Sequence, residues 1–143
     1  MNTDTALIMA LPNESKGLFE QAGIEVHYSG IGKINAAFKA FEVIQKTGCK
    51  TLINLGTAGS SSFNRHDLVE IKTFVQRDMD VSPLGFEVGV TPLDDHLAAE
   101  IHLRTHFADL PKGICGTGDS FETGQPKIRS EERRVGKECR SRW

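Results

Sequence analysis

The chain has 143 residues, with 17 Lys plus Arg against 19 Asp plus Glu, and 38% of its residues are hydrophobic. This composition fits one globular domain, or part of a larger one, with enough apolar residues to form a core. No apolar run approaches the roughly 18 residues of a membrane helix, and the longest one follows a polar start without a basic residue, so neither a membrane span nor a signal peptide is expected. A formal net charge of −2 gives no reason to expect nucleic acid as a partner. Three cysteines without a metal or disulfide spacing favour the cytoplasm.

The first half of the chain alternates between predicted strands and helices. Residues 6–11 form a continuous apolar run, which is typical of a strand covered on both faces. Pro12 suits the first turn of a following helix, which Gly23 is placed to end. Residues 24–28 alternate as a strand does, and residues 29–33 form a glycine turn. The next helix ends at Gly48 and precedes a strand at 51–55, and its apolar residues share one face: Ile34, Ala37, Phe38, Phe41 and Ile44.

The second half continues the same pattern. Residues 68–75 predict a strand, Asp94 can cap a helix that runs toward His106, and residues 113–116 predict a short strand. The sequence therefore predicts an α/β fold with helices on both faces of the sheet. In such a sheet the ligand site lies at the carboxyl ends of the strands. Three loops lie there: residues 11–14, 56–60 and 117–122.

Residues 129–143 differ from the rest of the chain. They hold six basic and three acidic residues, a net charge of +3, whereas residues 1–128 hold 11 basic and 16 acidic residues, a net charge of −5. This segment has one large aliphatic residue and no helical or strand periodicity. A solvated basic tail or a nucleic-acid arm would have such a charge. From Arg129 onward, however, the string resembles the translation of a common sequencing adapter, residue for residue. We therefore expect a non-native, disordered segment and a natural protein that continues differently after residue 128.

Several motifs have both a structural and a functional interpretation. The Gly30-Ile31-Gly32-Lys33 turn matches neither phosphate-loop template and is a weak signal. The Gly56-Thr57-Ala58-Gly59 loop follows a buried strand, so its backbone N–H groups could hold an anion or a sugar oxygen, or it could be a simple turn. Glu14 lies in a first helical turn, where a carboxylate stabilises the helix and could also act as a general base. Phe121 is either a core residue or a stacking platform for a flat ligand.

The remaining polar residues do not predict a metal site. Asp78 and Asp80 have no histidine nearby at ligand spacing, and the pair His102 and His106 lacks the zinc-protease motif. Cys115, in an apolar strand, is a core residue rather than a nucleophile. No metal and no cofactor is expected.

Together these segments resemble the 5′-methylthioadenosine/S-adenosylhomocysteine nucleosidases of the purine nucleoside phosphorylase superfamily. The similar segments occur in the family's order and span nearly all of residues 1–128. The resemblance implies a three-layer αβα fold with a mixed central sheet, here incomplete at its C-terminal end. The segments are residues 8–14, 29–37, 53–59, 78–81 with 85–87, and 117–121.

The resemblance also implies an activity and residue roles. The family cleaves the N-glycosidic bond of adenine thionucleosides with water and releases adenine. By position, Glu14 matches the acidic residue that places and deprotonates the water. Thr57, with the backbone of Ala58 and Gly59, matches the loop beside the ribose. Met9 matches a residue that lines the sugar and its 5′ side, and Phe121 matches the aromatic residue that packs on the purine.

Further implications concern partners and completeness. The expected ligand is a small-molecule purine nucleoside, and the expected assembly is a homodimer, with residues 78–87 near its interface. Two family motifs are missing from the chain: a Met-Glu segment that holds the ribose hydroxyls, and a Ser/Thr-Asp pair whose Asp protonates the purine. We therefore expect the chain as written to turn over poorly. The first loop also retains only Glu14 from a stretch that is acid-rich in the family.

Two alternatives remain. A phosphorolytic nucleoside phosphorylase has the same fold, but phosphate favours an arginine fork, and the loop after the first strand carries only Lys16. A non-catalytic nucleoside-binding fragment would bind without releasing adenine. A dinucleotide-binding oxidoreductase fits less well because its glycine fingerprint is absent.

Overall fold

The structure, a computed structural model, describes residues 4–93, 99–120 and 138–141, the last four by their backbone only. The chain divides into two compact units, Met1–Thr57 and Ala58–Trp143. Each unit contains a sheet of its own, and each is described separately.

The first unit is built on a parallel three-stranded sheet in the order β2-β1-β3. Its strands are β1 (Thr5–Met9), β2 (Val26–Tyr28) and β3 (Thr51–Asn54). The register pairs Met9 with Tyr28 on one side of β1 and Ile8 with Asn54 on the other. Because all three strands are parallel, their carboxyl ends lie at one edge of this sheet.

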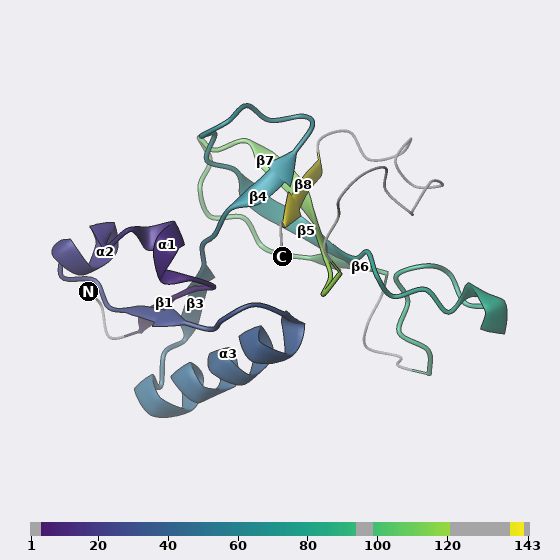
Figure 1. Ribbon diagram of the computed structural model, residues 1–143, viewed down its shortest axis with the longest axis horizontal. Coiled ribbons are helices and arrows are strands. Elements are labelled where there is room, and N and C mark those ends of the chain that lie inside the picture. Colours follow the sequence, from purple (N-terminus) through teal and green to yellow (C-terminus); the bar gives the residue numbers. More distant parts are fainter. Residues whose placement is uncertain (1–3, 94–98, 121–137, 142–143) are drawn as a thin grey trace. The chain divides into compact units, whose positions relative to one another are not determined.

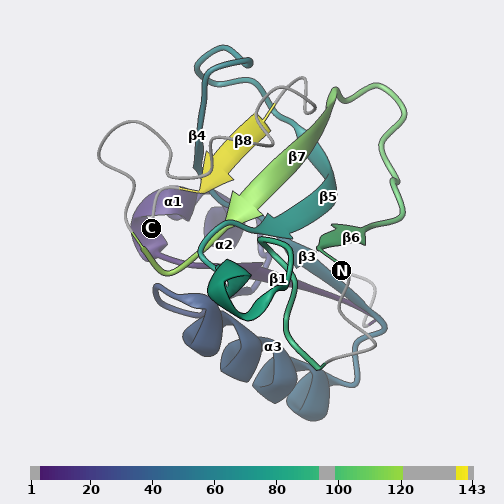
Figure 2. The ribbon, with the colours of Figure 1, turned by 90° about the vertical axis from the view of Figure 1, so that its right-hand side faces the viewer.

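Helices cover both faces of this sheet (Figures 1 and 2). The short helices α1 (Pro12–Ser15) and α2 (Leu18–Gln21) lie on one side, and the longer α3 (Lys33–Thr47) lies on the other. Four consecutive β1 residues, 6–9, are therefore buried, as the continuous apolar run predicts. Under α3, the buried residues Ala6, Val43 and Cys49 form a small core with Leu52 against it.

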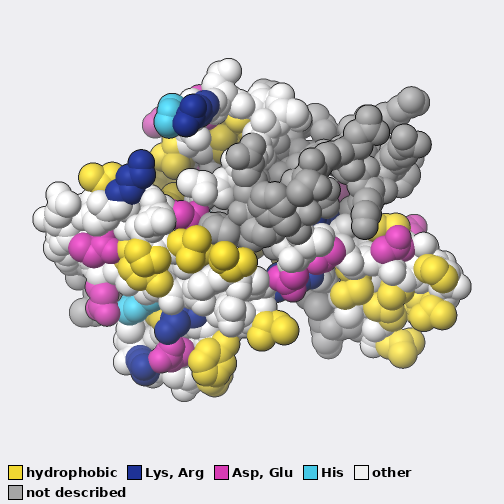
Figure 3. Space-filling view, viewed as in Figure 1, with side chains coloured by type: hydrophobic (Ala, Val, Ile, Leu, Met, Phe, Trp, Pro, Cys, Tyr) yellow, Lys and Arg dark blue, Asp and Glu magenta, His cyan; other side chains and the backbone are white. Residues whose placement is uncertain are grey.

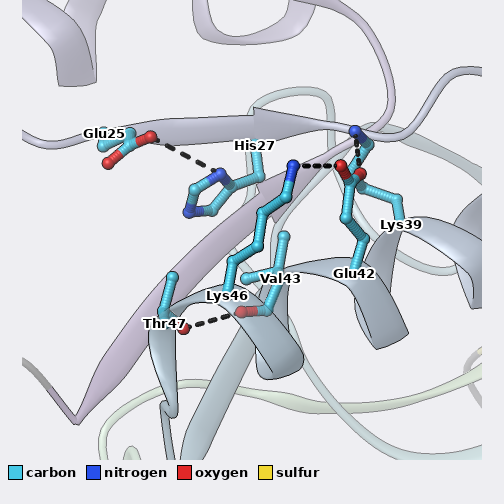
Figure 4. A network of polar contacts seen from close by, with 7 residues as sticks. All are labelled: Glu25, His27, Lys39, Glu42, Val43, Lys46 and Thr47. Atoms are coloured by element: carbon cyan, nitrogen blue, oxygen red, sulfur yellow. Dashed lines mark hydrogen bonds and ion pairs between the residues drawn. The ribbon is translucent and has the colours of Figure 1, made fainter.

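The end of α3 is fixed by polar contacts (Figure 4). The Thr47 hydroxyl donates to the Val43 carbonyl oxygen at 2.8 Å, and Gly48 ends the helix in the left-handed region at φ 65°. On the same helix Glu42 pairs with Lys39 at 2.6 Å and with Lys46 at 2.5 Å. Hydrogen bonds from Lys39 and then Lys46 lower the pKa of Glu42 to about 2.

The apolar face that the sequence predicts on α3 is present but exposed. Ile34 is 82% exposed and Phe38 69% exposed, while Val43 on another face is the buried residue of the helix. Figure 3 shows apolar side chains at the surface over α3, between charged ones. The helix packs on β1 and β2. The residue it buries, Val43, lies on a different face from the apolar one that the sequence predicts.

The second unit contains a mixed five-stranded sheet in the order β4-β8-β7-β5-β6 (Figure 2). Strand β7 pairs in parallel with both β5 and β8, whereas β4 and β6 pair antiparallel at the two edges. A 3₁₀ helix, η1 (Ser82–Leu84), follows β5 in the chain. The strands are β4 (Ala58–Ser60), β5 (Glu70–Gln76), β6 (Glu100–His102), β7 (Lys112–Thr117) and β8 (Glu138–Ser141).

Glu70 anchors the segment between β6 and β7. Its carboxylate accepts hydrogen bonds from Lys112 Nζ at 2.6 Å, from the His106 N–H at 2.6 Å and from the Phe107 N–H at 3.2 Å. These donors, with Lys112 the largest influence, lower the pKa of Glu70. A single side chain thus ties an irregular segment to the start of β5.

Several local predictions need correction. The helix expected from Asp94 to His106 is wrong at Ile101, which lies in β6 opposite Phe74; residues 94–98 are outside the described part. A single helix from Pro12 to Gly23 is also wrong, because Lys16 and Gly17 both adopt left-handed backbone conformations and separate α1 from α2. At Ile101, pairing with β5 outweighs the helical spacing of the apolar residues. After Pro12, the left-handed turn at Lys16 interrupts the expected helix.

Two more segments are strands that the sequence does not predict. The loop expected at 56–60 becomes strand β4 from Ala58 onward, and β8 lies within the segment expected to be disordered. Among the described residues, no helix is long and apolar enough to cross a membrane.

The core under α3 gives a stability test. We expect Val43→Ala to lower the free energy of unfolding by about 1–2 kcal/mol, because Val43 is 3% exposed and its removal leaves a cavity. The control Ile34→Ala, on the exposed face of the same helix, should change it by less than about 0.5 kcal/mol. Urea unfolding followed by circular dichroism measures both. Equal losses in the two variants would contradict the assigned packing of α3.

Candidate functional site

The candidate site lies in the first unit, where the segments after the three parallel strands meet. The segment after β1 forms α1, the one after β2 forms the glycine turn, and the one after β3 is residues 55–57. Backbone hydrogen bonds tie these segments together: the Ser29 N–H donates to the Met9 carbonyl oxygen at 2.9 Å, and the Leu55 N–H donates to that of Ile8 at 3.0 Å. The rigid edge of the sheet therefore positions the residues that follow.

Glu14 is the centre of this arrangement. Its Oε1 accepts hydrogen bonds from the Thr57 N–H at 2.8 Å and from the Thr57 hydroxyl at 2.9 Å. Its Oε2 accepts one from the Leu11 N–H at 3.1 Å. The carboxylate is thus held by the loop after β3 and by the residue that precedes its own helix. Gly56 lies so close that an added Cβ would stand 3.2 Å from Oε1.

Local sequence explains how Glu14 reaches this place. Pro12 starts the helix with a backbone N–H that needs no partner, and the bond from the Leu11 N–H to Glu14 is half of a capping box. The helix ends after one turn because Lys16 adopts φ 50° and Gly17 φ 73°. This short helix points its third residue at the loop after β3.

A second polar cluster lies beside Glu14. Ser15, which is 1% exposed, places its Oγ 2.5 Å from the Tyr28 hydroxyl and 3.2 Å from the Gly17 N–H, which donates to it. The Tyr28 hydroxyl donates to Glu20 in a short hydrogen bond. The cluster therefore joins α1, α2 and the end of β2.

The hydrogen bonds of this cluster shift two pKa values. The bond from Tyr28 is the main cause that lowers the pKa of Glu20. The same bond is the main cause that raises the pKa of Tyr28, because it stabilises the protonated phenol beside a carboxylate.

The structure brings together only some of the residues that the sequence predicts for the site. Glu14 and Thr57 are in direct contact. Met9 is the last residue of β1 and is 2% exposed, at the same edge of the sheet. Ala58 and Gly59 belong to β4 in the second unit, and Phe121 lies outside the described residues.

The loop that precedes Phe121 has its own support in the second unit. The Asp119 N–H donates to Asp78 Oδ2 at 2.6 Å, and Arg77 Nη1 donates to the Ser120 hydroxyl at 3.0 Å. A Cβ added to Gly118 would stand 2.9 Å from the Asp78 Cγ. Asp78 is therefore a residue that holds this loop in place.

Three residues of the second polar cluster were not predicted from the sequence: Ser15, Glu20 and Tyr28. Tyr28 did carry a signal, as the only tyrosine in the chain and the last residue of a predicted strand. Ser15 carried none, because a serine in a predicted helix usually faces solvent.

The described residues offer no metal centre. Across 4–93, 99–120 and 138–141, no three His, Cys, Asp or Glu side chains gather where they could hold a metal ion. His102 lies in β6, with its Nδ1 3.1 Å from the Thr73 hydroxyl, and His106 lies in the following segment.

Comparison with known proteins identifies the family. Residues 16–139 match the model of the phosphorylase superfamily. The chain belongs to this superfamily, and its α/β fold with a mixed sheet is the fold of that family.

Two of its curated relatives are nucleosidases. A 5′-methylthioadenosine/S-adenosylhomocysteine nucleosidase from Anoxybacillus flavithermus is 34% identical over 118 residues, covering 73% of this chain and 50% of that protein. An aminodeoxyfutalosine nucleosidase from Campylobacter jejuni is 32% identical over 119 residues, covering 71% of this chain and 51% of that protein. The chain spans about half the length of the curated relatives it matches.

Solved structures agree on the fold. A Helicobacter pylori MTAN mutant with 5′-methylthioadenosine in the active site matches with a TM-score of 0.81 and 20% identity, over 99% of this chain and 76% of that one. A Neisseria meningitidis 5′-methylthioadenosine/S-adenosylhomocysteine nucleosidase in complex with methylthio-immucillin-A matches with a TM-score of 0.77 and 21% identity, over 96% and 74%.

The cluster around Tyr28 can be tested by titration. Tyrosinate absorbance near 295 nm reports Tyr28 alone, because the chain has one tyrosine. We expect its midpoint above the ordinary value of about 10. Glu20→Gln should bring it back toward that value because the acceptor loses its charge. In the wild type, the hydrogen bond from Tyr28 to Glu20 stabilises the folded state fully below pH about 10. This contribution is lost as the pH rises through the raised pKa of Tyr28. A midpoint unaffected by Glu20→Gln would contradict the cluster.

The close approach of Asp78 to Gly118 predicts a steric effect of a side chain at position 118. Gly118→Ala should lower the free energy of unfolding by about 1–3 kcal/mol, because the new methyl group overlaps Asp78. The matched control is Gly116→Ala, whose Cβ would meet the nearest Arg77 atom at 3.5 Å, an ordinary contact. Urea denaturation compares the two, and a Gly118→Ala protein as stable as the control would show that Asp78 does not lie against this glycine.

Proposed function

We propose that the protein to which this chain belongs hydrolyses the N-glycosidic bond of adenine thionucleosides, such as 5′-methylthioadenosine or S-adenosylhomocysteine, and releases adenine. One observation carries the proposal: Glu14, at the carboxyl end of β1, is fixed by the backbone and side chain of Thr57 after β3. The name of the Anoxybacillus flavithermus relative supports these substrates, and that of the Campylobacter jejuni relative supports cleavage of a nucleoside.

In this reaction Glu14 is the general base. Water adds to C1′ of the ribose while the C1′–N9 bond breaks, and the water proton passes to the carboxylate. The electron pair of the broken bond goes to the purine, which leaves as neutral adenine by taking up a proton from an acid that the described residues do not supply, the role of the missing Ser/Thr-Asp pair. A carboxylate has about four lone-pair positions. The described hydrogen bonds use two on Oε1 and one on Oε2, so the second position on Oε2 is suited to accept the water proton.

The remaining roles follow from position. We assign the ribose side to Thr57 with the backbone of Ala58 and Gly59, the sugar and its 5′ substituent to Met9, and the purine face to Phe121. Burial of Met9 at the end of β1 supports an apolar wall there. We also propose a cytoplasmic homodimer, without metal or cofactor, as the working form.

Phosphorolysis is the competing reaction. A phosphate dianion favours a guanidinium fork. The turn that carries Glu14 contains one cationic side chain, the exposed Lys16. The Glu14 carboxylate itself would repel a phosphate anion. This charge arrangement favours water as the nucleophile. A chain that binds nucleoside without cleaving it is the other outcome of the assay.

Residues 129–143 need a separate test. We propose that they are not native sequence and that residues 1–128 are the amino-terminal part of the phosphorylase domain. Sequencing the source DNA across the codons for Lys127, Ile128 and Arg129 decides this. A frame that runs into Arg129 and onward in independent reads would refute it.

The proposed base gives a kinetic prediction. In the product of the verified reading frame, Glu14→Gln should lower kcat for adenine release from 5′-methylthioadenosine by about a hundredfold or more, because the amide cannot take the water proton. Adenine is measured by chromatography, with and without phosphate. We expect the 143-residue chain itself to release little adenine.

Glu25→Gln is the matched control. Glu25 is a carboxylate of the same unit whose side chain is 82% exposed, and it pairs with His27 at 3.7 Å. Its substitution should leave kcat unchanged. Release that requires phosphate would establish phosphorolysis instead, and equal rates for wild type and Glu14→Gln would rule out Glu14 as the base.

A further inference from the structure

Two consecutive residues of α1 reach opposite neighbours in the sheet. Glu14 contacts Thr57, which follows β3, and Ser15 contacts Tyr28, which ends β2. Since β1 lies between these two strands, α1 is held from both sides at the carboxyl edge. The turn that carries the proposed base therefore has two attachments, and the proposed function gives a role only to the first.

The second attachment is a directed chain of hydrogen bonds. The Gly17 N–H donates to Ser15 Oγ at 3.2 Å, and the Tyr28 hydroxyl donates to Glu20. Ser15 Oγ lies 2.5 Å from the Tyr28 hydroxyl, and its own proton is also within reach of the Pro12 carbonyl oxygen at 3.2 Å and of Glu20 Oε1 at 3.4 Å. The chain ends on a carboxylate, which makes it stronger and more directional than neutral hydrogen bonds.

Packing alone does not require this cluster. Ser15 is the most deeply buried side chain among the described residues, at 1% exposed. An alanine there would avoid the cost of burying a hydroxyl group. A hydroxyl with a fixed partner specifies an orientation, which an apolar contact does not. The contribution of the cluster is thus the angle at which α1 leaves the sheet.

We propose that Ser15, Tyr28 and Glu20 form a positioning unit for Glu14, which sets the orientation of α1 so that the Glu14 carboxylate meets Thr57. The inference rests on the proposed function only for its kinetic consequence. Its structural content is a coupling between Tyr28 and Thr57, two residues that contact α1 from opposite sides.

The coupling can be read without any activity. In the full 143-residue chain, the amide proton of Thr57 donates to a carboxylate, so its NMR shift reports the position of Glu14. Glu14→Gln defines the shift when the charge is lost. We expect Tyr28→Phe and Ser15→Ala to move the Thr57 signal toward the Glu14→Gln position. Glu20→Gln, which keeps an acceptor oxygen, should move it less.

Thr47→Val is the control. It removes two hydrogen bonds of a hydroxyl in the same unit, one to the Val43 carbonyl oxygen at 2.8 Å and one from the Cys49 N–H at 3.2 Å, at the end of α3 and far along the chain from α1. It should leave the Thr57 signal in place. A Thr57 signal unmoved by Tyr28→Phe, with β1 and α3 signals intact, would overturn the proposal. An equal movement of the Thr57 signal in Thr47→Val would also overturn it, because the movement would then reflect a general destabilisation of the unit. If Ser15→Ala does not fold, Tyr28→Phe decides.

A kinetic arm separates this inference from the proposed function. In the verified full-frame product, Tyr28→Phe should lower kcat about tenfold with KM nearly unchanged, as expected for a displaced general base. Absence of adenine release in the wild type would refute the proposed function, while the Thr57 signal would still decide the coupling. Normal kcat in Tyr28→Phe together with an active wild type would overturn the positioning role.

Discussion

The parallel pairing of β1 between β2 and β3 is the constraint on which the first unit depends. It brings the carboxyl ends of three strands to one edge, so residues far apart in the sequence, such as Glu14 and Thr57, become neighbours. It also buries β1 on both faces, which requires the helices on either side. The site therefore depends on the parallel direction of the strands, and α1 holds the Glu14 carboxylate at their shared edge.

The sequence predicts this part of the fold well because its signals are local. The apolar run at 6–11, Pro12 and Gly48 each report the structure of their own segment. The helix start at Pro12 and the helix end at Gly48 lie where they were expected, and the strand predicted at 6–11 is present but ends at Met9. The local sequence also predicts the position of Glu14, because a carboxylate in the first helical turn after a strand lies near the carboxyl end of that strand. Thr57 lies in the small-residue loop that was expected after the strand at 51–55, but its contact with Glu14 was not predicted. The prediction that this strand is buried is wrong, because β3 has no buried residue.

The parts of the fold that were not predicted depend on contacts between segments that are distant in the sequence. Ile101 has helical spacing in the sequence but pairs with Phe74 in the sheet. Lys16 carries no sign of a left-handed conformation, yet it divides one expected helix into two. The apolar residues of α3 repeat at helical spacing, but the sheet buries a different strip, centred on Val43. Ser15 and Tyr28 are paired only after β2 has been placed beside β1.

The brevity of α1 has a consequence for dynamics. A single helical turn costs more conformational entropy to nucleate than its hydrogen bonds return, so it does not persist alone in water. Its geometry is supplied by Thr57 on one side and Tyr28 on the other. Such segments open at a lower free energy than the strands beneath them. On warming, we expect the turn that carries Glu14 to fray before the sheet melts, so loss of the site precedes global unfolding.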